Sequence, residues 1–412
     1  MMNGRWLGIA ISVAVAVAGC GKDEPGGSAA KPGAAKPAPA MNADVKLSLP
    51  TAETTAIEPE RLAKAQRLLN GGLAFLLARR DADGTWSLGK GAMKPAITAL
   101  VLKCLLQHPD FDRTSPAVQR GLEVLRSYQQ PDGAVFDPKQ GRPAYSTAIT
   151  IMALVSAGDP QFNGAIRRAS QYLQGIQIQP GQESPDGEVI GQNDAKVGGV
   201  GYGKNKEPNL SVLQFVMEAW HESGMEADHE AMKRAVGFLS RIQNRSESNP
   251  MAFAKQGSND GGFVYDLETS KAGEGPGGAG LRSYGSMTYA GFKSMLYAGV
   301  DKNDPRVQAA YMWIRRYWRL DSNPNMPKLR SNQGLFYYFH VFGKTLRAWG
   351  QDEIPDLKGT KHNWRNELID ALAARVGPDG SWANKDASRW EEGNPVLGTC
   401  YAVLALEEAL RK

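Results

Sequence analysis

Twelve helical segments of two alternating kinds constrain the fold of this chain more than any other feature of its sequence. Segments of the first kind place apolar residues at helical spacing and charged residues on the opposite face. These charged-face segments cover residues 61–80, 116–128, 163–176, 229–242, 305–320 and 363–376. Segments of the second kind are apolar nearly all round, and they cover residues 96–107, 145–157, 209–220, 285–298, 334–349 and 396–406.

This alternation predicts two concentric rings of helices. A helix with one charged face needs water on that side, whereas a helix that is apolar all round must be buried. One pair of such helices cannot bury its own apolar surface, but pairs stacked around a closed circle can. The sequence therefore predicts an all-α fold, an (α/α)6 toroid of six outer and inner helix pairs, over residues 58–412.

The N-terminus carries the pattern of an exported protein. After Arg5 comes the apolar run WLGIAISVAVAVAG, which is long enough for a signal sequence and short for a membrane span. It ends in VAGC, which resembles the lipobox of bacterial lipoproteins and implies a signal peptide over residues 1–19 and lipid attachment at Cys20. A plain signal anchor with an incidental cysteine is the alternative. We expect a protein of the cell envelope, held to a bacterial membrane by lipid.

Residues 20–57 are rich in glycine, proline and alanine, so they predict a flexible tether. The remaining cysteines, Cys104 and Cys400, lie in apolar helical patterns, which favours buried free thiols over the single disulfide that export would allow. The formal net charge is only +5, with 22% of residues charged. This balance lacks the concentrated basic face of a nucleic-acid-binding protein, so we expect no nucleic-acid partner.

A short turn signal recurs between the outer and inner segments. Asp-Gly favours a tight turn with positive φ, and the aromatic residue that follows can pack back onto the outer helix. The copies are Asp83-Gly84-Thr85-Trp86, Asp132-Gly133 with Phe136, Gly198-Gly199 with Tyr202, Asp260-Gly261-Gly262-Phe263 and Asp379-Gly380-Ser381-Trp382. The fifth pair has DSNPNMP instead. We predict that these aromatic residues join loops to helices rather than bind a ligand.

These residues carry a family resemblance. GGLAFLLARRDADGTW (71–86) and GLEVLRSYQQPDGAVF (121–136) resemble the QW repeats of squalene–hopene cyclases and their prenyltransferase relatives. In that family a glutamine and a Gly-x-Trp join the loop to the outer helix. Here Arg80 stands at the first glutamine position, while Gln130 and Gln243 fit the pattern. The resemblance implies the toroid fold over the whole of residues 58–412, but a fold does not fix a function.

The catalytic signatures of the family are missing. The chain has no Asp-x-Asp-Asp, the acid motif of the cyclases, and Gly398 occupies the place of a zinc-binding histidine in prenyltransferase β subunits. Cys400 and His340 could hold a metal, but no third ligand is in view, so we expect no metal and no cofactor. Glycosidases use two spaced carboxylates. The loop acids that could serve are Asp194, Glu207, Asp260, Glu391 and Glu392.

One rim of the toroid should attract anions. All inner helices run in the same direction, so their N-termini and free backbone N–H groups meet at one rim. The loops before the inner helices also contain more basic than acidic residues, among them Lys94, Arg142, Lys204, Arg282 and Arg330. This pattern predicts a cavity mouth that accepts an anionic head group. A solvated, slightly basic loop surface is the alternative.

Tyrosines and a histidine in the first part of the inner helices supply flat apolar faces with polar tips. With residues of the rim they form the candidate site: Tyr145, Arg282, Tyr284, Tyr337, Tyr338, His340, Trp390, Glu392 and Tyr401. We predict a membrane-tethered protein that binds a hydrophobic or amphipathic ligand in its central cavity, either a lipid or isoprenoid-like small molecule or a peptide. The alternative is an enzyme on the same fold, a divergent terpene cyclase or a glycan-acting hydrolase or lyase.

Overall fold

The computed structural model describes residues 47–49 and 56–412. Contact clustering divides the chain into two units, and all described residues belong to the second, Met41–Lys412. The predicted signal peptide, Cys20 and most of the predicted tether lie outside the described residues. No helix in the described ranges is both long and apolar enough to cross a bilayer.

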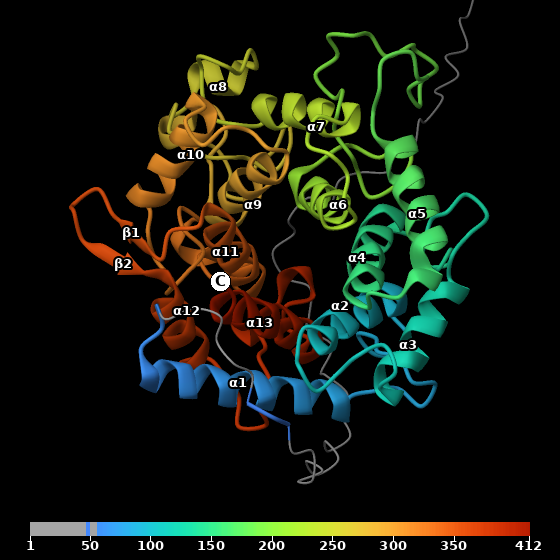
Figure 1. The fold of residues 1–412 in the computed structure, drawn as a ribbon. Coiled ribbons are helices and arrows are strands. Elements are labelled where there is room, and N and C mark those ends of the chain that lie inside the picture. The colour runs from blue at the N-terminus through green and yellow to red at the C-terminus, as the bar shows by residue number, and fades with distance from the viewer. Residues whose placement is uncertain (1–46, 50–55) are drawn as a thin grey trace, which may run out of the picture. The chain divides into compact units, whose positions relative to one another are not determined.

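Six buried helices form the inner ring (Figure 1). Each packs against the next along the chain, and the last returns to the first, so the ring closes. Their bounds are α2 Lys94–Leu106, α4 Pro143–Ser156, α6 Leu210–Glu222, α9 Gly285–Tyr297, α11 Leu335–Trp349 and α13 Pro395–Leu410. Burial covers all sides of these helices, as their apolar composition predicts.

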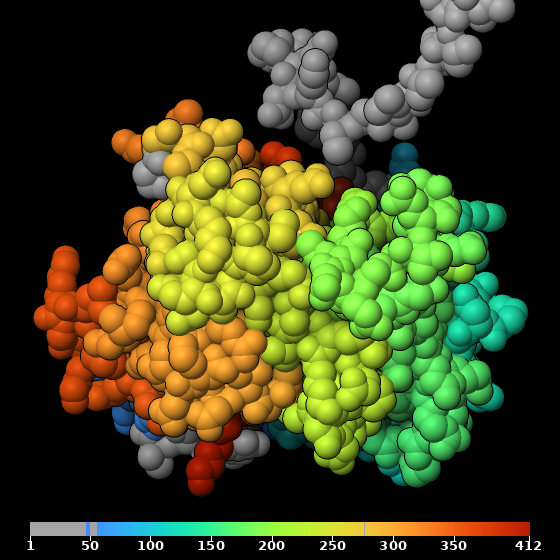
Figure 2. All heavy atoms as spheres, turned by 90° about the horizontal axis from the view of Figure 1, so that it is seen from above, coloured from blue at the N-terminus to red at the C-terminus, as the bar shows by residue number. Residues whose placement is uncertain are grey.

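The outer ring consists of amphipathic helices whose apolar stripes cover the inner ring (Figure 1). Their bounds are α1 Pro59–Ala78, α3 Pro116–Ser127, α5 Asn163–Ile176, α7 Glu230–Arg241, α10 Pro305–Arg316 and α12 Trp364–Ala373. In Figure 2 the green, yellow and orange segments of successive pairs lie side by side as a continuous outer wall. The all-α toroid with strictly alternating outer and inner helices is therefore confirmed.

The first and last pairs close the ring through side chains as well as packing. Helix α1 lies against α12 and α13. Asp370 on α12 receives Arg61 Nε at 2.7 Å and Lys64 Nζ at 2.9 Å from α1. Asn394 caps α13 by accepting the Val396 N–H at 2.9 Å, and its amide donates to the Leu88 carbonyl at 3.0 Å. The N-terminal end of the folded region is thus fixed to the C-terminal pair.

The remaining short elements lie in the loops that connect the ring helices. A two-stranded antiparallel hairpin, β1 Glu353–Pro355 and β2 Lys361–Asn363, separates α11 from α12. Short helices are α8 Ala252–Gln256, η1 Pro160–Phe162, η2 Pro276–Gly278, η3 Lys328–Arg330, η4 Lys385–Ala387 and η5 Arg389–Glu391. Cys104 and Cys400 are buried and unbridged, and the Cys104 thiol lies 3.6 Å from the Cys400 carbonyl oxygen.

The two tryptophans of the turn signal join loop to helix. Trp86 and Trp382 are fully buried. The Trp86 indole N–H donates to the Leu76 carbonyl at 2.6 Å, and the Trp382 indole donates to the Leu372 carbonyl at 2.9 Å, in each case near the end of the preceding outer helix. Neither lines the central pocket described below.

Threonines at the fifth position of inner helices complete these joints. Thr98 Oγ1 accepts the Trp86 backbone N–H at 3.1 Å, and Thr399 Oγ1 accepts that of Trp382 at 3.0 Å. The same bond recurs from Val135 to Thr147 at 2.8 Å. Valine, not Phe136, therefore occupies the tryptophan position of the second pair, which corrects the sequence prediction.

In three of the pairs, one glutamine holds the turn to the next outer helix. Gln243 Nε2 donates to the Gly261 carbonyl at 2.9 Å and to the Arg306 carbonyl at the start of α10 at 2.8 Å. Gln129 and Gln177 bond in the same manner to the first turns of α5 and α7. Gln130, which the sequence favoured for this role, instead bonds within its own loop. In the second pair the clamp is therefore one residue earlier than predicted, whereas Gln243 occupies the predicted position.

Candidate functional site

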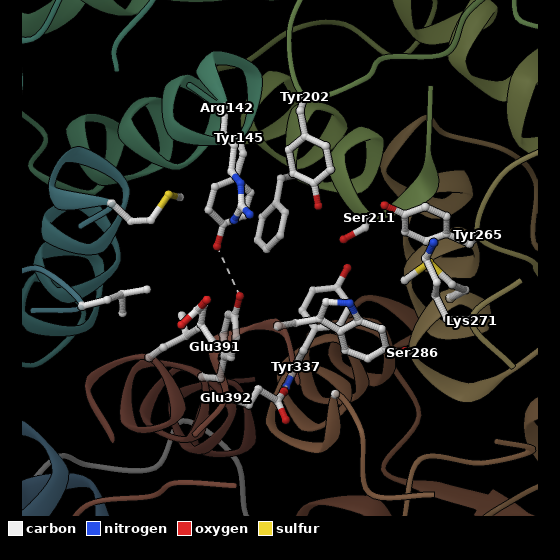
Figure 3. Close-up of a pocket in the computed structure, with 18 of the residues that line it drawn as sticks. Arg142, Tyr145, Tyr202, Ser211, Tyr265, Lys271, Ser286, Tyr337, Glu391 and Glu392 are labelled. Carbon is white, nitrogen blue, oxygen red and sulfur yellow. Dashed lines mark hydrogen bonds between the residues drawn. The ribbon is translucent and has the colours of Figure 1, made fainter. Parts of the chain in front are cut away.

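A pocket of about 170 Å³ opens where the N-terminal ends of the inner helices meet (Figure 3). Every inner helix contributes to its wall from its N-terminal half, its N-cap or the residue just before it, and the preceding loops contribute the rest. The lining residues are Leu88, Met93, Ile97, Arg142, Tyr145, Tyr202, Ser211, Phe215, Tyr265, Lys271, Tyr284, Ser286, Met287, Gly334, Tyr337, Trp390, Glu391, Glu392, Leu397 and Tyr401.

Four aromatic rings in this wall form a closed box, which we call the aromatic box: Tyr145, Phe215, Tyr337 and Tyr401. Their centroids lie 5.1 Å apart for Tyr145 and Phe215, 6.1 Å for Phe215 and Tyr337, and 5.8 Å for Tyr337 and Tyr401. The fourth side is a hydrogen bond of 3.2 Å between the hydroxyls of Tyr145 and Tyr401 (Figure 3). The box therefore joins α4, α6, α11 and α13 at the level of the pocket.

Further hydroxyls converge on the opposite wall. The hydroxyls of Tyr202, Tyr265 and Ser211 face the cavity from the side of α6 and its neighbouring loops (Figure 3). The Tyr337 hydroxyl is buried and has no hydrogen-bond partner in the described part of the chain. Burial raises the pKa of Tyr145 to about 12, so this phenol is neutral at physiological pH. The pocket thus presents neutral hydrogen-bonding groups on aromatic walls.

Two cations stand at the pocket over aromatic faces. The Arg142 guanidinium lies 5.6 Å from the ring centre of Tyr202, and Lys271 Nζ lies 4.0 Å from that of Tyr265. Arg142 is the N-cap residue of α4 and has a left-handed φ of 60°. Its side chain forms no ion pair with the described residues. Both cations line the pocket, and both lie over the ring of a tyrosine that also lines it.

The acidic side of the pocket comes from a strained loop. Trp390 and Glu391 have consecutive left-handed φ values of 59° and 66°, a conformation that residues other than glycine rarely adopt. This backbone directs Glu391 into the pocket beside the Tyr145–Tyr401 pair (Figure 3). The Trp390 ring lies against Gly334, where a Cβ would meet it at 3.1 Å. Glycine at 334 therefore makes room for the loop.

Glu392 connects helix α11 to the loop that precedes α13 through two hydrogen bonds. One carboxylate oxygen accepts the Tyr337 N–H in the first turn of α11 at 2.7 Å, and the other accepts the Asn384 side-chain amide at 2.9 Å. Glu392 thus supplies the cap that Gly334 cannot provide for α11. Burial raises the pKa of Glu392 to about 7, against the lowering effect of these N–H donors.

Beneath the aromatic box lies His340, which stacks on Phe215 at 6.2 Å and on Tyr401 at 5.4 Å. Burial, together with the charge of Lys344, lowers the pKa of His340 to about 3, so the imidazole is neutral. Its Nδ1 has no hydrogen-bond partner in the described ranges. The histidine forms the boundary between the pocket and the layer below.

That layer is a buried charge network, which we call the charged floor. The Glu218 carboxylate on α6 accepts a hydrogen bond from Lys293 on α9. Its other oxygen, Oε1, lies 2.6 Å from Lys344 Nζ on α11. Lys344 also contacts Glu408 on α13 at 3.2 Å. Lys103 on α2 reaches Glu222 at 2.7 Å. Burial opposes the ionisation of Glu218, but the two lysines hold its pKa well below its usual range.

The structure brings most of the sequence-predicted candidates together. Those that line the pocket are Tyr145, Tyr284, Tyr337, Trp390, Glu392 and Tyr401. The three others lie elsewhere. Tyr338 is fully buried and donates to the Arg319 carbonyl at 2.8 Å, so it packs between helices. Arg282 donates to the Glu274 carbonyl in its own loop at 3.2 Å. His340 belongs to the boundary below the box.

Sequence reasoning missed several lining residues. Tyr202 was expected to pack onto an outer helix, but it lines the pocket. Tyr265, Lys271, Ser211 and Phe215 were not singled out, although Ser211 and Phe215 lie on an inner helix at a spacing of four residues, the spacing of one helical face. Tyr265 and Lys271 come from a long loop whose course no local pattern encodes. In the described residues, no three His, Cys, Asp or Glu side chains gather as metal ligands would.

Comparison with known proteins agrees with this architecture. Residues 91–257 match the family model of the squalene-hopene cyclase C-terminal domain. The type II terpene cyclase MstE from Scytonema is similar at 15% identity with a TM-score of 0.51, over 84% of this chain and 99% of that chain. A variant of MstE in complex with merosterolic acid A as product is 14% identical over 86% of this chain and 99% of that chain, with a TM-score of 0.51.

A wild-type glycosidase is equally similar, at 14% identity and a TM-score of 0.51, over 86% of this chain and 100% of that chain. No curated protein matches the sequence. At these identities the likeness establishes a fold: the chain is a squalene-cyclase-like α/α toroid, as its repeats indicate. Since a terpene cyclase and a glycosidase share this fold, its function has to be argued from the pocket.

Proposed function

We propose that this protein binds an amphipathic organic anion in its central pocket, with the apolar part against the aromatic walls and the anionic group at Arg142 and Lys271. The observation that carries the proposal is the pairing of a pocket wall rich in aromatic residues with the Arg142 guanidinium, which forms no ion pair with the described residues, and with Lys271 over the Tyr265 ring. Pockets of this kind, apolar with a few placed polar groups, are typical of small-molecule sites.

The helix arrangement supports an anionic group. The N-terminal ends of all six inner helices point towards the pocket, and each end carries a partial positive charge. At α11 the Glu392 carboxyl group already interacts with this partial positive charge, because it caps the first turn of the helix. Arg142 and Lys271 add full charges near the entrances of α4 and α9. An anion at the mouth would be stabilised by both contributions.

The geometry favours binding over two-carboxylate chemistry. Glu391 and Glu392 are the acids that line the pocket in the described chain. Both oxygens of Glu392 already accept N–H groups, so this residue holds α11 and its loop together. One carboxylate remains, whereas hydrolysis of a glycosidic bond ordinarily uses two. The cyclase motif Asp-x-Asp-Asp does not occur in the sequence.

We further propose that the protein is an exported lipoprotein that carries lipid on Cys20. The VAGC sequence after an apolar run supports this, as does the Gly/Pro/Ala-rich stretch that follows. Metabolic labelling with a palmitate analogue should mark the wild-type protein and leave Cys20→Ala unlabelled. If Cys20→Ala is labelled as strongly as wild type, the lipid is not on Cys20.

Titration calorimetry with phenyl phosphate and phenol tests the binding proposal on the full chain. Both probes fit an aromatic wall, but only phenyl phosphate offers an anion. We expect phenyl phosphate to bind and phenol to bind at least about tenfold more weakly, since hydrogen bonds to charged groups contribute about 1.5–3 kcal/mol. Arg142→Gln and Lys271→Gln should each weaken phenyl phosphate by a similar factor, and Lys204→Gln, outside the pocket, should not. Equal binding of both probes would contradict the proposal.

A further inference from the structure

Four hydroxyl groups converge in the pocket on the side of α6, and we call them the hydroxyl cluster: Tyr202, Ser211, Tyr265 and Tyr337. Figure 3 shows their oxygens pointing towards one another and into the cavity. All four side chains line the pocket and are half-buried, so a ligand in the cavity can reach them. They come from two inner helices, α6 and α11, and from the loops that precede α6 and α9.

Backbone hydrogen bonds fix the two loop tyrosines of this cluster. The Ala144 N–H at the start of α4 donates to the Tyr202 carbonyl at 3.1 Å. The Leu210 N–H, which belongs to the first residue of α6, donates to the Tyr265 carbonyl at 2.9 Å. Ser211 is the next residue of α6. Three members of the cluster are therefore placed by the first turns of inner helices, which reduces the ordering cost when a ligand binds.

The phenol groups of the cluster are neutral, and one lacks a partner. Burial raises the pKa of Tyr265 well above the usual phenol range, and the adjacent Tyr202 raises it further. Burial also raises the pKa of Tyr337, while the neighbouring Ser211 acts in the opposite direction. Even so, the buried Tyr337 hydroxyl has no hydrogen bond of good geometry to the described residues. A buried hydroxyl of this kind has donor capacity left for water or a ligand.

Cations lie over the ring faces of two tyrosines in the cluster. The Arg142 guanidinium is 5.6 Å from the ring centre of Tyr202, and Lys271 Nζ is 4.0 Å from that of Tyr265. A phenol oxygen lies in the plane of its ring, so each cation occupies a face while the hydroxyl extends into the cavity. Positive charge near a phenol favours release of its proton, and it therefore also strengthens hydrogen-bond donation to an acceptor.

The charges around the cluster select an anionic ligand group. Hydroxyls both donate and accept, so alone they would suit an ammonium as well. Asp266, next to Tyr265 in the chain, accepts backbone N–H groups and the Thr269 hydroxyl of its own loop. Glu391 is exposed and lies beside the hydroxyl pair that closes the aromatic box, not in the cluster (Figure 3). With cations on two of its rings, the cluster favours negative charge.

We infer that the hydroxyl cluster is the subsite for the oxygens of the ligand's anionic group. The inference rests on the proposed function, because it assigns the groups that recognise the anion of that same ligand. The hydroxyls donate to the oxygens, while Arg142 and Lys271 act through the rings that carry two of the hydroxyls. The ligand class is therefore an organic oxyanion with several acceptor oxygens, such as a phosphate ester, a sulfate ester or a carboxylate.

Tyrosine-to-phenylalanine variants test the cluster, because they remove one hydroxyl and keep the ring beneath its cation. In titration calorimetry on the full chain, Tyr265→Phe and Tyr337→Phe should each weaken phenyl phosphate at least about fivefold. Both should change the binding of phenol less than about twofold, since phenol carries no anion. Tyr172→Phe, on α5 and outside the pocket, is the matched control and should change neither.

Phenyl sulfate and benzoate extend the test to the other oxyanions. Each should lose affinity in the same two variants, and the probe that wild type binds most tightly identifies the anionic group. Unchanged phenyl phosphate affinity in folded Tyr265→Phe and Tyr337→Phe proteins would overturn the inference. If circular dichroism shows that a tyrosine variant does not fold, Ser211→Ala replaces it with the same expectation. Tighter binding of benzylamine than of phenyl phosphate would also overturn the inference, because the cluster would then serve as an acceptor.

The two proposals fail in different ways. If Arg142→Gln and Lys271→Gln weaken phenyl phosphate but the hydroxyl variants do not, the cations hold the anion directly, so the inference is wrong and the proposed function stands. If the hydroxyl variants weaken phenyl phosphate and the two cation variants do not, the inference stands and the assignment of the anion to the cations is wrong. If phenyl phosphate does not bind to the folded wild-type protein, both proposals are wrong.

Discussion

At the scale of single residues, we expect the buried tryptophans of the turn signal to contribute more to stability than Trp390, which lies in another loop and is exposed. Trp86 is fully buried and its indole N–H donates to the Leu76 carbonyl, whereas Trp390 is 41% exposed. Trp86→Phe removes that donor, leaves the carbonyl unpaired and opens a small cavity. We expect it to lower the free energy of unfolding by about 1–3 kcal/mol.

Urea denaturation measures this effect, and Trp390→Phe serves as its control with an expected change within about 0.5 kcal/mol. Trp382→Phe should behave like Trp86→Phe, since its indole makes the equivalent bond to Leu372. If Trp86→Phe and Trp390→Phe cost the same, the joint between loop and outer helix does not depend on the indole.

Glu392 should make stability depend on pH. Burial raises its pKa from the ordinary 4.5 to about 7. Between these values the folded protein holds a proton that the unfolded chain has released, so folding is favoured at low pH and loses this contribution as pH rises to about 7. A shift of this size corresponds to about 3 kcal/mol.

Glu392→Gln removes the titration and keeps the shape of the side chain. The unfolding free energy of wild type minus that of Glu392→Gln, measured in urea, should therefore fall between pH 4.5 and pH 8 by up to about 3 kcal/mol. Asp386→Asn, an exposed acid of the same loop, should show no comparable trend. A difference that stays constant or rises with pH would show that the carboxyl is not held in its neutral form by burial.

At the scale of elements, the glutamine clamp explains how a turn fixes the next outer helix. Gln243 is fully buried, and its amide joins the Gly261 carbonyl to the Arg306 carbonyl of α10. Gln243→Ala leaves both carbonyls without this donor, so we expect a loss of about 2–3 kcal/mol and faster amide exchange at the start of α10. Hydrogen-exchange mass spectrometry locates the effect.

Gln130→Ala is the control for this prediction, because Gln130 bonds to Tyr128 and Phe136 within one partly exposed loop. Its cost should stay below about 1 kcal/mol. Should Gln130→Ala prove as costly as Gln243→Ala, or the α10 amides remain protected in Gln243→Ala, the clamp would not be what holds the turn to α10.

The helices could be predicted from sequence because their signal is periodic and local. Charged faces at helical spacing and fully apolar stretches placed all twelve ring helices within a few residues of their ends, as for α4 and α10. The joints were harder. Loops of unequal length shift the register of the turn signal, so Phe136 was preferred to Val135, and Gln130 to Gln129. Thr98, Thr147 and Thr399 accept a backbone N–H from the turn at the same helix position, so the register of each joint is also marked by a threonine.

The site could be predicted only in part, for a physical reason. Tyr145, Tyr337 and Tyr401 lie on inner helices, where position along the helix gives depth in the ring. Tyr265 and Lys271 reach the pocket from a loop whose path depends on tertiary packing. Tyr338 and Tyr337 are adjacent in sequence but lie on different faces of α11, and only one faces the pocket. The position of a residue along an inner helix could thus be predicted from sequence more readily than the helix face on which its side chain lies.

At the scale of the whole molecule, six inner helices enclose an axis that must be filled along its length. The pocket occupies the N-terminal end, and the charged floor closes the other. Replacing such a buried network by apolar residues is often neutral or stabilising, but removing one partner is costly because it leaves charges uncompensated. Lys103, Glu218, Lys293, Lys344 and Glu408 come from five different inner helices. We interpret their pairing as a device that fixes which helices meet at the floor.

Glu218 is the centre of this network, so its loss should affect the whole ring. Glu218→Gln leaves Lys293 and Lys344 together without their shared counter-charge, and we expect it to cost about 3–5 kcal/mol in urea denaturation. Glu222→Gln should cost less, since the Glu222 side chain is 22% exposed whereas that of Glu218 is fully buried. Adding Lys293→Met to Glu218→Gln removes one uncompensated charge and should recover part of the loss. If the double variant is less stable than Glu218→Gln by the full cost of Lys293→Met alone, the two residues act independently, and the floor does not join α6 to α9 through charge.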